Sequence, residues 1–387
     1  DEDFTADVVE LYFDLAFVFA FSQLVAFLVG EHTLTAIGKG ALLFLLIWLP
    51  WSQFTWSANA VSSGSRIVRF LFLVATVATI PMAASVQSAF EDGGPTFAIS
   101  LSVIVAMALF VIVSGMETGS DIWRGAVRYA VPTGITMAVV IAGSFLEDEA
   151  RIVAWIVAIL IFLYGTIRAG ESEWIIRTGH FAERHALIVI VALGEVIVAL
   201  GVPVVNSFQE GKGLPAETIA ALIAAGTFSG LLWWSYFDRP APALELRAEG
   251  VTDARDRGRY ARDVYTYSHA PMVAGVILAA AALEEVTLHP TDPLDATFRW
   301  MLFAGLAGFL GGVGLAVWRA YRVVAKERIA AMAVIGLVLV AAGSLDGLVL
   351  VVLVDLVLVL MLIAEQLRIE GPTGTSETVE VAEDPSA

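Results

Sequence analysis

Runs of about twenty apolar residues follow one another along the whole chain, and this recurrence constrains the fold more than any other feature. Roughly twenty apolar residues are needed for a helix to cross the hydrocarbon core of a bilayer. The 387 residues are 58% hydrophobic, which is far above the usual composition of a soluble domain. We therefore predict an all-α, polytopic membrane helix bundle with about twelve transmembrane helices. The predicted spans lie near residues 8–29, 39–60, 67–89, 96–116, 124–146, 151–173, 183–204, 217–237, 264–286, 298–319, 328–344 and 346–367.

Basic residues are unevenly distributed over the loops between these spans. Of the 22 lysines and arginines, 18 fall on alternate loops that share one side, and the other four are Lys39, Arg151, Lys212 and Arg299. Cytoplasmic loops carry the excess of basic residues in membrane proteins. This predicts a multipass protein of the inner (plasma) membrane with both termini in the cytoplasm. The charged segment 238–263 would be its largest cytoplasmic connection, a solvated helix or loop.

Several classes of chemistry are excluded or disfavoured by composition. The chain has no cysteine, which excludes disulfides, thiol catalysis and thiolate metal sites. The net charge is −17 and no basic patch is present, so nucleic acid is not an expected partner. The acidic tail at 371–387 contains no basic residue and is predicted to be disordered. The expected partners are the lipid bilayer and an unidentified small solute or ion, while cofactor and oligomeric state are left open.

Weak internal similarity suggests that the chain contains two related halves. Four short matches occur in the same order, with offsets that rise smoothly from 172 to 200 residues. The matched positions are Gln23 with Glu195, Trp51 with Trp234, Pro81 with Pro271, and Ala142 with Ala342. We predict a duplication of six spans, giving an N-terminal repeat at 1–178 and a C-terminal repeat at 179–370. An even number of spans makes the repeats parallel, as in transporters whose halves enclose a site.

Ionisable residues inside membrane spans are costly, so they usually face a bundle interior and mark function. One group shares the cytoplasmic depth of the predicted bundle: Glu10, Asp14, Glu183, Arg184, His185, Asp238 and His269. These residues could form a proton relay, a gating network or a substrate vestibule. They could equally form an ion-pair network that locks the two halves together.

Glu195 is placed near the midplane, roughly 15 Å deeper than His185 at the rise of an α-helix. Gln23 occupies the matching place in the other half. A repeat-built transporter would hold its substrate or ion between two such residues. Alternatively, the two side chains hydrogen-bond across a helix interface as packing contacts, with Glu195 protonated. Asp355, isolated in the last span, is a weaker candidate.

Two further readings concern metals and aromatic residues. His180, Glu183, Asp238 and His269 could together bind zinc or iron. His180 and Glu183 lie three residues apart on one helix face, whereas Asp238 and His269 belong to two other predicted helices. Tryptophans such as Trp51 and Trp234 lie late in the second and eighth spans, where anchoring at the membrane interface is favoured over a stacking site.

The polar motifs together resemble the bacterial low temperature requirement protein A (LtrA) family over about residues 8–365. The resemblance is carried by Val9 to Ala20 with Gln23, His180 to His185, Leu193 to Glu195, Trp233 to Asp238, and Tyr267 to Gly275. It implies a multipass inner-membrane protein linked by name to growth in the cold, with no settled activity. The matching motif residues are Glu10, Asp14, Gln23, Glu183, Arg184, His185, Glu195, Asp238 and His269. Mild departures are Val196, where serine or threonine is common, and Ala270, where a larger apolar residue is frequent.

The leading functional prediction is a secondary transporter or permease rather than an enzyme, and proton coupling is the mechanism that these residues would serve. Glu195 and Gln23 would form its central site, and the cytoplasmic group would handle protons or gating. One alternative is a membrane-embedded, metal-dependent enzyme acting on lipid. The other is a non-transporting membrane scaffold or sensor.

Overall fold

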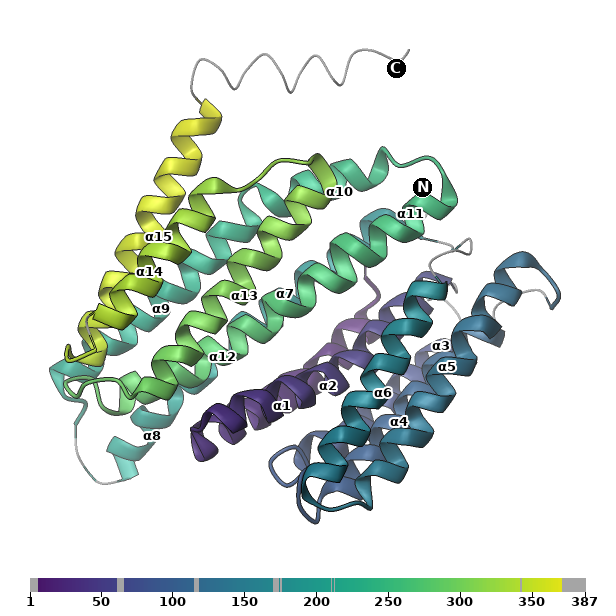
Figure 1. Ribbon diagram of the computed structural model, residues 1–387, viewed down its shortest axis with the longest axis horizontal. Helices are drawn as coiled ribbons and strands as arrows, with labels where there is room; N and C mark the ends of the chain where they lie inside the picture. The colour runs from purple at the N-terminus through teal and green to yellow at the C-terminus, as the bar shows by residue number, and fades with distance from the viewer. Residues whose placement is uncertain are drawn as a thin grey trace.

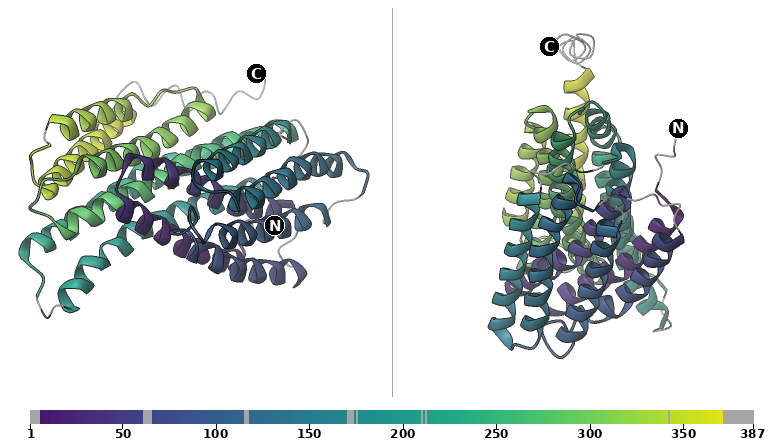
Figure 2. Two further views of the ribbon diagram at one scale, coloured as in Figure 1. Left: turned by 60° about the horizontal axis from the view of Figure 1, so that its bottom comes forward. Right: turned by 90° about the vertical axis from the view of Figure 1, so that its right-hand side faces the viewer.

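The computed structural model describes residues 6–60, 66–114, 118–169, 174, 176–209, 211, 213–341 and 343–370. Within these ranges the regular structure is helical, and an isolated bridge pairs Pro293 with Asp346. The tail at 371–387, predicted to be disordered, lies outside the described residues. The helices lie roughly side by side along a common direction (Figure 2). The predicted all-α fold is therefore confirmed for the described part of the chain.

Six long helices form the N-terminal part of the structure, and the remainder contains both long and short helices (Figure 1). The first six are α1 (Val8–Glu31), α2 (Leu34–Ala60), α3 (Arg66–Ala84), α4 (Gly94–Ser114), α5 (Asp121–Ser144) and α6 (Asp148–Ala169). The others are α7 (Thr178–Ala199), α8 (Gly201–Gln209), α9 (Ala216–Phe237), α10 (Pro240–Glu249), α11 (Ala254–Tyr260), the π-helix η1 (Ala261–Tyr267), α12 (Ser268–Leu288), α13 (Ala296–Tyr321), α14 (Lys326–Ala341) and α15 (Gly347–Glu370).

Ten helical stretches of the described chain are long and apolar enough to cross a membrane. They are Val8–Glu31, Leu34–Asn59, Arg66–Ala84, Gly94–Val113, Trp123–Ser144, Asp148–Arg168, Ala216–Glu249, Ala254–Leu288, Ala296–Tyr321 and Gly347–Arg368. Helices also lie at the two remaining predicted spans, but α7 carries Glu183, Arg184 and Glu195, and α14 has only 16 residues. The chain is thus a multipass membrane protein with at least ten helices of membrane-spanning character.

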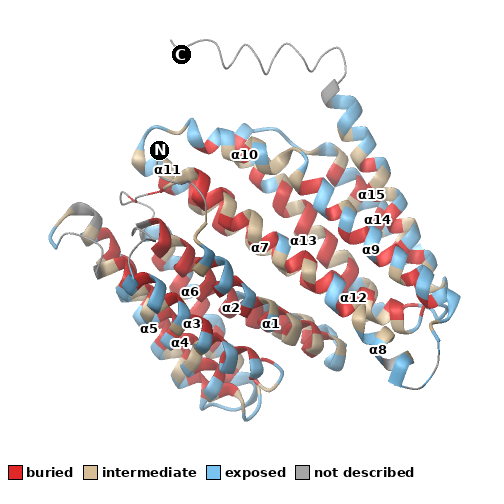
Figure 3. Ribbon diagram, turned by 180° about the vertical axis from the view of Figure 1, so that it is seen from behind, coloured by how far each residue is buried: buried red, intermediate tan, exposed pale blue. Residues whose placement is uncertain are grey.

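Large apolar side chains are exposed on the outer faces of the bundle. Leu337 and Val340 of α14 are 70% and 73% exposed, and Ile67 of α3 is 68% exposed. Buried residues gather where helices face one another (Figure 3). In water such faces would be unfavourable, whereas in a bilayer they contact acyl chains.

The helix neighbours in the two parts of the chain resemble each other. Helix α1 packs against α2 and α3, and α7 packs against α9 and α12. The successive contacts from α3 through α6 recur from α12 through α15. The parts also differ, because α2 packs against α4 whereas α9 packs against α12 and α15. The interface between the N-terminal and C-terminal parts is formed mainly by α1, which contacts both α7 and α12.

The predicted cytoplasmic connection at 238–263 is folded against the bundle. Helix α10 packs against α7, α9 and α13 and buries Leu244 and Ala248. The Tyr260 hydroxyl donates to the Leu244 carbonyl over 2.9 Å. The connection therefore places η1, and with it the start of α12, beside α7.

Arg151 is one of the four basic residues that do not lie on the arginine-rich loops, and its contacts explain why an arginine is needed there. Its side chain is buried at the start of α6 and donates to three carbonyls: Leu146 at 3.0 Å, Ala89 at 2.9 Å and Glu91 at 2.6 Å. It therefore ties the turn after α3 to the turn before α6. Arg151 therefore has a structural role, which is to hold these two turns together.

We expect Arg151→Gln to lower the free energy of unfolding by about 1.5–3 kcal/mol, the contribution of a hydrogen bond to a charged group. A glutamine is shorter and cannot reach all three carbonyls. Thermal unfolding in detergent, followed by tryptophan fluorescence, measures the change. Arg66→Gln, at an exposed arginine of α3, is the matched control and should leave the transition in place. Equal stability of the two variants would show that the three hydrogen bonds of Arg151 do not stabilise the fold.

Candidate functional site

Four charged or ionisable side chains meet between α1 and α7. Glu10 and Asp14 lie one turn apart on α1, and His180 and Arg184 lie one turn apart on α7, so each pair shares a helix face. The start of α1 is capped by Asp7, whose carboxylate accepts from the Val9 amide over 3.1 Å. Because α1 packs against α7, the two faces oppose each other inside the protein. We call Glu10, Asp14, His180 and Arg184 the ion cluster.

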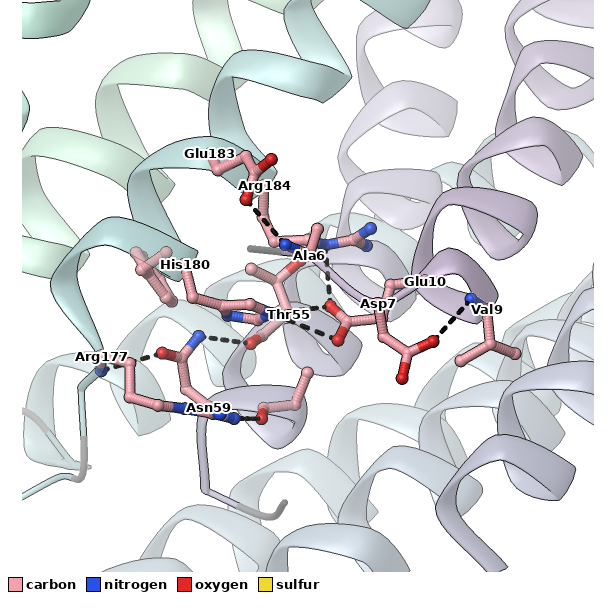
Figure 4. Close-up of polar contacts among 12 residues, drawn as sticks. Ala6, Asp7, Val9, Glu10, Thr55, Asn59, Arg177, His180, Glu183 and Arg184 are labelled. Carbon is pink, nitrogen blue, oxygen red and sulfur yellow. Dashed lines mark hydrogen bonds and ion pairs between the residues drawn. The ribbon is translucent and has the colours of Figure 1, made fainter. Parts of the chain in front are cut away.

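The start of α7 is held in place by the end of α2. The Asn59 side chain accepts from the Arg177 amide over 3.0 Å and donates to the Thr55 carbonyl over 3.0 Å (Figure 4). On the other side, Glu183 accepts from the Ala6 amide over 2.7 Å. These backbone contacts fix where α7 begins relative to α1 and α2.

Arg184 and Asp14 form a two-point ion pair. Nη1 donates to Oδ2 over 2.7 Å and Nη2 donates to Oδ1 over 2.8 Å. The indole Nε1 of Trp51 also donates to Asp14 Oδ1, over 2.9 Å. Arg184 and Trp51 are 0% exposed and Asp14 is 2% exposed. The predicted interface anchor Trp51 is therefore a buried hydrogen-bond donor, which corrects that expectation for this residue.

Glu10 links the second pair of the ion cluster. His180 Nε2 lies 3.0 Å from Glu10 Oε2 and 3.2 Å from Oε1, and Arg184 Nε lies 3.4 Å from Oε2 (Figure 4). Two carboxylates thus face one guanidinium and one imidazole. The charges cancel only if His180 is protonated or one carboxyl group is. Because an uncompensated charge is expensive in the interior, the ion cluster is balanced when it binds one exchangeable proton.

A layer of aromatic and imidazole rings adjoins the ion cluster. The His185 and His269 ring centroids are 5.2 Å apart, and His185 also contacts Trp51 edge-on at 5.1 Å. His185 Nδ1 lies 2.8 Å from the Phe181 carbonyl, which assigns the proton to Nδ1 and leaves the buried Nε2 without a partner among the described residues. The Tyr236 hydroxyl lies 2.7 Å from His269 Nε2. His185 is therefore hydrogen-bonded through Nδ1, and His269 through Nε2 on the side of Tyr236.

The π-helix η1 places His269 in this layer. His269 Nδ1 lies 3.2 Å from the Val264 carbonyl, which precedes it by five residues. The wider turn of a π-helix leaves carbonyls available for such bonds and is frequent at functional sites. Tyr265, within η1, has a ring centroid 5.4 Å from that of His185. Its buried hydroxyl has no partner among the described residues.

Glu195 is buried deeper in the bundle, apart from the ion cluster. Its Oε2 accepts from the Ser22 hydroxyl over 2.7 Å, and its Oε1 has no partner among the described residues. Gln23 points elsewhere and accepts from the Gln87 side chain over 2.6 Å. The expected pairing of Glu195 with Gln23 is therefore replaced by a pairing with Ser22, because adjacent residues on a helix point about 100° apart.

The remaining predicted residues do not join the ion cluster. Asp238, at the end of α9, has a side chain that is 40% exposed and lies 3.4 Å from Arg239. Glu183 bonds to the chain start, as described above. Asp355 of α15 is 8% exposed, and its Oδ1 has no partner among the described residues. The seven residues predicted to share one depth thus divide into separate environments.

The proposed metal set is also separated. His180 binds Glu10, and His269 binds Tyr236, while Glu183 and Asp238 are engaged elsewhere. In the described part of the chain, no three His, Asp or Glu side chains are arranged to hold a metal ion. The four residues named from sequence therefore do not form one coordination site.

A second buried ionic contact was not anticipated from sequence. Arg328 of α14 is 3% exposed and donates to Glu365 Oε1 over 2.8 Å. It also donates to the hydroxyl and carbonyl of Ser235, over 2.9 and 2.7 Å. The pair joins α14 and α15 to the end of α9. Its residues lie at span ends, where charge is common, so the sequence contained no signal that separated them from ordinary loop charges.

Fold and site define a multipass helical membrane protein with a buried ion cluster between its first and seventh helices. Comparison with known families then places it: the chain belongs to the family described as bacterial low temperature requirement A protein (LtrA), whose family model matches residues 5–363. It is 29% identical over 313 residues to the uncharacterized protein RA0937 of Rhizobium meliloti (strain 1021), covering 78% of this chain and 75% of the relative. No solved structure gives a significant match.

Proposed function

We propose that this protein is a secondary transporter or permease for a small solute or ion, coupled to protons through the ion cluster. The observation that carries the proposal is the burial of two carboxylates against one guanidinium and one imidazole between α1 and α7. Buried charges inside a membrane bundle are costly and characteristically line proton or substrate pathways. The single proton that balances this cluster is the one we assign to coupling.

We further propose two parallel six-helix halves, 1–178 and 179–370, with α7 and α14 also crossing the membrane. The recurring neighbour relations of α1, α2 and α3 with α7, α9 and α12 support this division. Both termini would then be cytoplasmic, in agreement with the distribution of arginines. The ion cluster lies where the halves would meet, the position of sites in repeat-built transporters.

Glu195 is the proposed substrate-side or ion-side carboxylate. It is 1% exposed, holds Ser22 with one oxygen, and has no partner for the other among the described residues. An unpaired buried carboxyl oxygen costs free energy unless a ligand or proton satisfies it. Gln23 remains a proposed contributor, through a change of rotamer or a ligand that spans both residues.

Glu195→Gln is expected to abolish solute-coupled proton movement while leaving the fold intact, because the amide is close in size but cannot present the negative charge proposed to bind the solute or ion. The measurement uses pyranine-loaded proteoliposomes under an imposed pH gradient, with sodium, potassium or an amino-acid mixture added outside. Asp355→Asn is the matched control at another buried carboxylate of the bundle. Proton movement at the wild-type rate in Glu195→Gln would remove Glu195 from the mechanism.

A second candidate is a non-transporting scaffold or membrane sensor. It is favoured by one observation, the complete burial of Glu10 and Arg184, which suits a static lock between helices. A wild-type protein that moves no protons with any added solute would favour this function. The metal-dependent enzyme loses support because its four proposed ligands lie apart.

A further inference from the structure

An apolar groove runs along the outside of the bundle between α2, α6 and α12. It has a volume of about 370 Å³ and is lined by Phe44, Trp48, Ile159, Leu163, Ala270 and Ala274. This volume lies within the range of about 300–1,000 Å³ that is typical of ligand pockets. Leu45 and Leu163 at its edges are 38% and 37% exposed. The groove is therefore open to the acyl chains that surround the bundle.

One end of the groove continues into a smaller cavity, whose lining is largely aromatic but includes hydroxyl groups and one guanidinium group. The two spaces share Ser52, Phe162, Thr266 and Tyr267, and the smaller one is also lined by Trp56 and Arg262. Here the Trp56 indole donates to the Thr266 hydroxyl over 3.0 Å, and the Thr166 and Tyr267 hydroxyls are hydrogen-bonded. The combined site is apolar along most of its length, and its hydroxyl groups and the Arg262 guanidinium gather at one end.

Arg262 lines the end of the site that has the hydroxyl groups, and it shares a carboxylate with Arg319 beside the cavity. Arg262 lies 2.7 Å from Asp263, and the same carboxylate accepts from Arg319 over 2.9 Å. Two guanidinium groups thus share one carboxylate, which leaves one positive charge uncompensated among these three residues. Their side chains are between 19% and 30% exposed, so the charge is accessible.

The long axis of the site matches the depth of one leaflet. From Ala274 of α12 to Tyr267 the helix rises about 10 Å at 1.5 Å per residue, and the π-helical residues of η1 back to Arg262, which rise less per residue, bring the total to below about 18 Å. One leaflet of hydrocarbon is about 15 Å thick. An acyl chain beside Ala274 would therefore have its headgroup near Arg262.

We propose that this groove binds an anionic phospholipid of the surrounding bilayer, with an acyl chain along α2, α6 and α12 and its phosphate beside Arg262. An anionic phospholipid is the occupant that satisfies both the apolar length and the basic end. Basic pockets between transmembrane helices recognise lipid headgroups by the same physics. The site is distinct from the ion cluster, and the proposal does not depend on transport.

Quenching by brominated lipid tests this site once the exposed Trp233, Trp234, Trp300 and Trp318 are replaced by phenylalanine, because Trp48 and Trp56 line the site. The purified full chain is reconstituted in phosphatidylcholine vesicles that contain a small, varied fraction of dibrominated phosphatidylglycerol or dibrominated phosphatidylcholine. We expect an apparent association about five-fold stronger for the anionic lipid, the preference that one arginine near the membrane surface provides. Equal quenching by the two lipids would overturn the proposal.

Two variants locate the effect within the groove. Arg262→Gln should remove the preference for phosphatidylglycerol, and Arg66→Gln, at an exposed arginine outside the groove, should retain it. Ala270→Phe should fill the groove and reduce quenching at low fractions of brominated phosphatidylglycerol, whereas Ala330→Phe on the exposed face of α14 should not. Phenylalanine adds no tryptophan signal. An unchanged preference in both Arg262→Gln and Ala270→Phe, with folding verified by size-exclusion chromatography, would place the lipid elsewhere.

Discussion

Replacing Arg184 by methionine is expected to lower the free energy of unfolding by about 3–5 kcal/mol, because it leaves buried carboxylates without their cation. Asp14 loses both of its hydrogen bonds to the guanidinium, and Glu10 retains only His180. Thermal unfolding of the purified protein in a mild detergent measures the loss. Among the interactions of the described residues, this ion pair combines complete burial with two-point geometry, which is why the effect should be large.

The exposed pair between Arg69 and Asp7 provides the matched control. It has a similar separation of 2.9 Å, but the Arg69 side chain is 52% exposed. Arg69→Met should therefore cost only about 0–1 kcal/mol. A double variant, Arg184→Met with Asp14→Leu, should be less destabilised than the sum of its single variants. It lacks the Asp14 carboxylate, which Arg184→Met alone leaves buried without a cation. Simple additivity would show that the two side chains do not interact in the folded protein.

Replacing Gly305 by leucine is expected to prevent the protein from folding, because α12 and α13 cross there with their backbones in contact. A methyl group built on Gly305 would lie 2.6 Å from the Gly275 carbonyl oxygen and 2.9 Å from the Ala279 nitrogen. Methyl groups built on Gly308 and Gly312 would lie 2.7 and 2.6 Å from the carbonyl oxygens of Pro271 and Ser268. These neighbours are backbone atoms, so no change of rotamer can make room and the helices must separate.

Gly305→Ala should already cost about 1–3 kcal/mol, the typical cost of overpacking. Size-exclusion chromatography after a temperature ramp, with detection by tryptophan fluorescence, measures both variants. Gly226→Ala on α9 is the control, since a methyl group there meets no atom within 4 Å. It should be neutral or stabilising by up to about 1 kcal/mol, because alanine favours a helix over glycine. A folded Gly305→Leu protein would show that the crossing is looser than described.

The crossing of α12 and α13 also matters for the site, because α12 carries His269. Its first turns follow the π-helix, and Ser268 donates to the Asp263 carbonyl over 2.8 Å. Moving α12 away from α13 would shift His269 relative to His185 and Tyr236. Variants at this crossing are therefore expected to alter the imidazole layer even where the protein still folds.

Much of the architecture follows from the sequence. Apolar runs of bilayer length predict helices wherever the structure has long ones, since a backbone in hydrocarbon must bond internally. The cost of placing charge inside a membrane predicts a functional or structural role for Glu10, Asp14, Arg184 and Glu195, and all four are buried. Family membership is confirmed by the match over residues 5–363.

The sequence does not predict which side chains contact one another, because many of these helices are apolar on every side. A helix without a polar face does not reveal which residues point inward. Ser22 and Gln23 are adjacent, yet only Ser22 faces Glu195. The position of Trp51 near the end of its span predicts an interface anchor, whereas its indole donates to the buried Asp14. Glu183 and Asp238 share a depth with the ion cluster but point away from it.

The sequence by itself thus determined the class of protein, its helices and the buried charges that need a reason, because hydrophobic length and the cost of charge depend on residue type. Tertiary structure alone decided that Glu10 and Asp14 meet His180 and Arg184, and that Glu195 meets Ser22. Those pairings depend on how each helix is rotated and which helix lies beside it. Close contacts such as that of Gly305 with Gly275 set these rotations, and they join residues far apart in the chain.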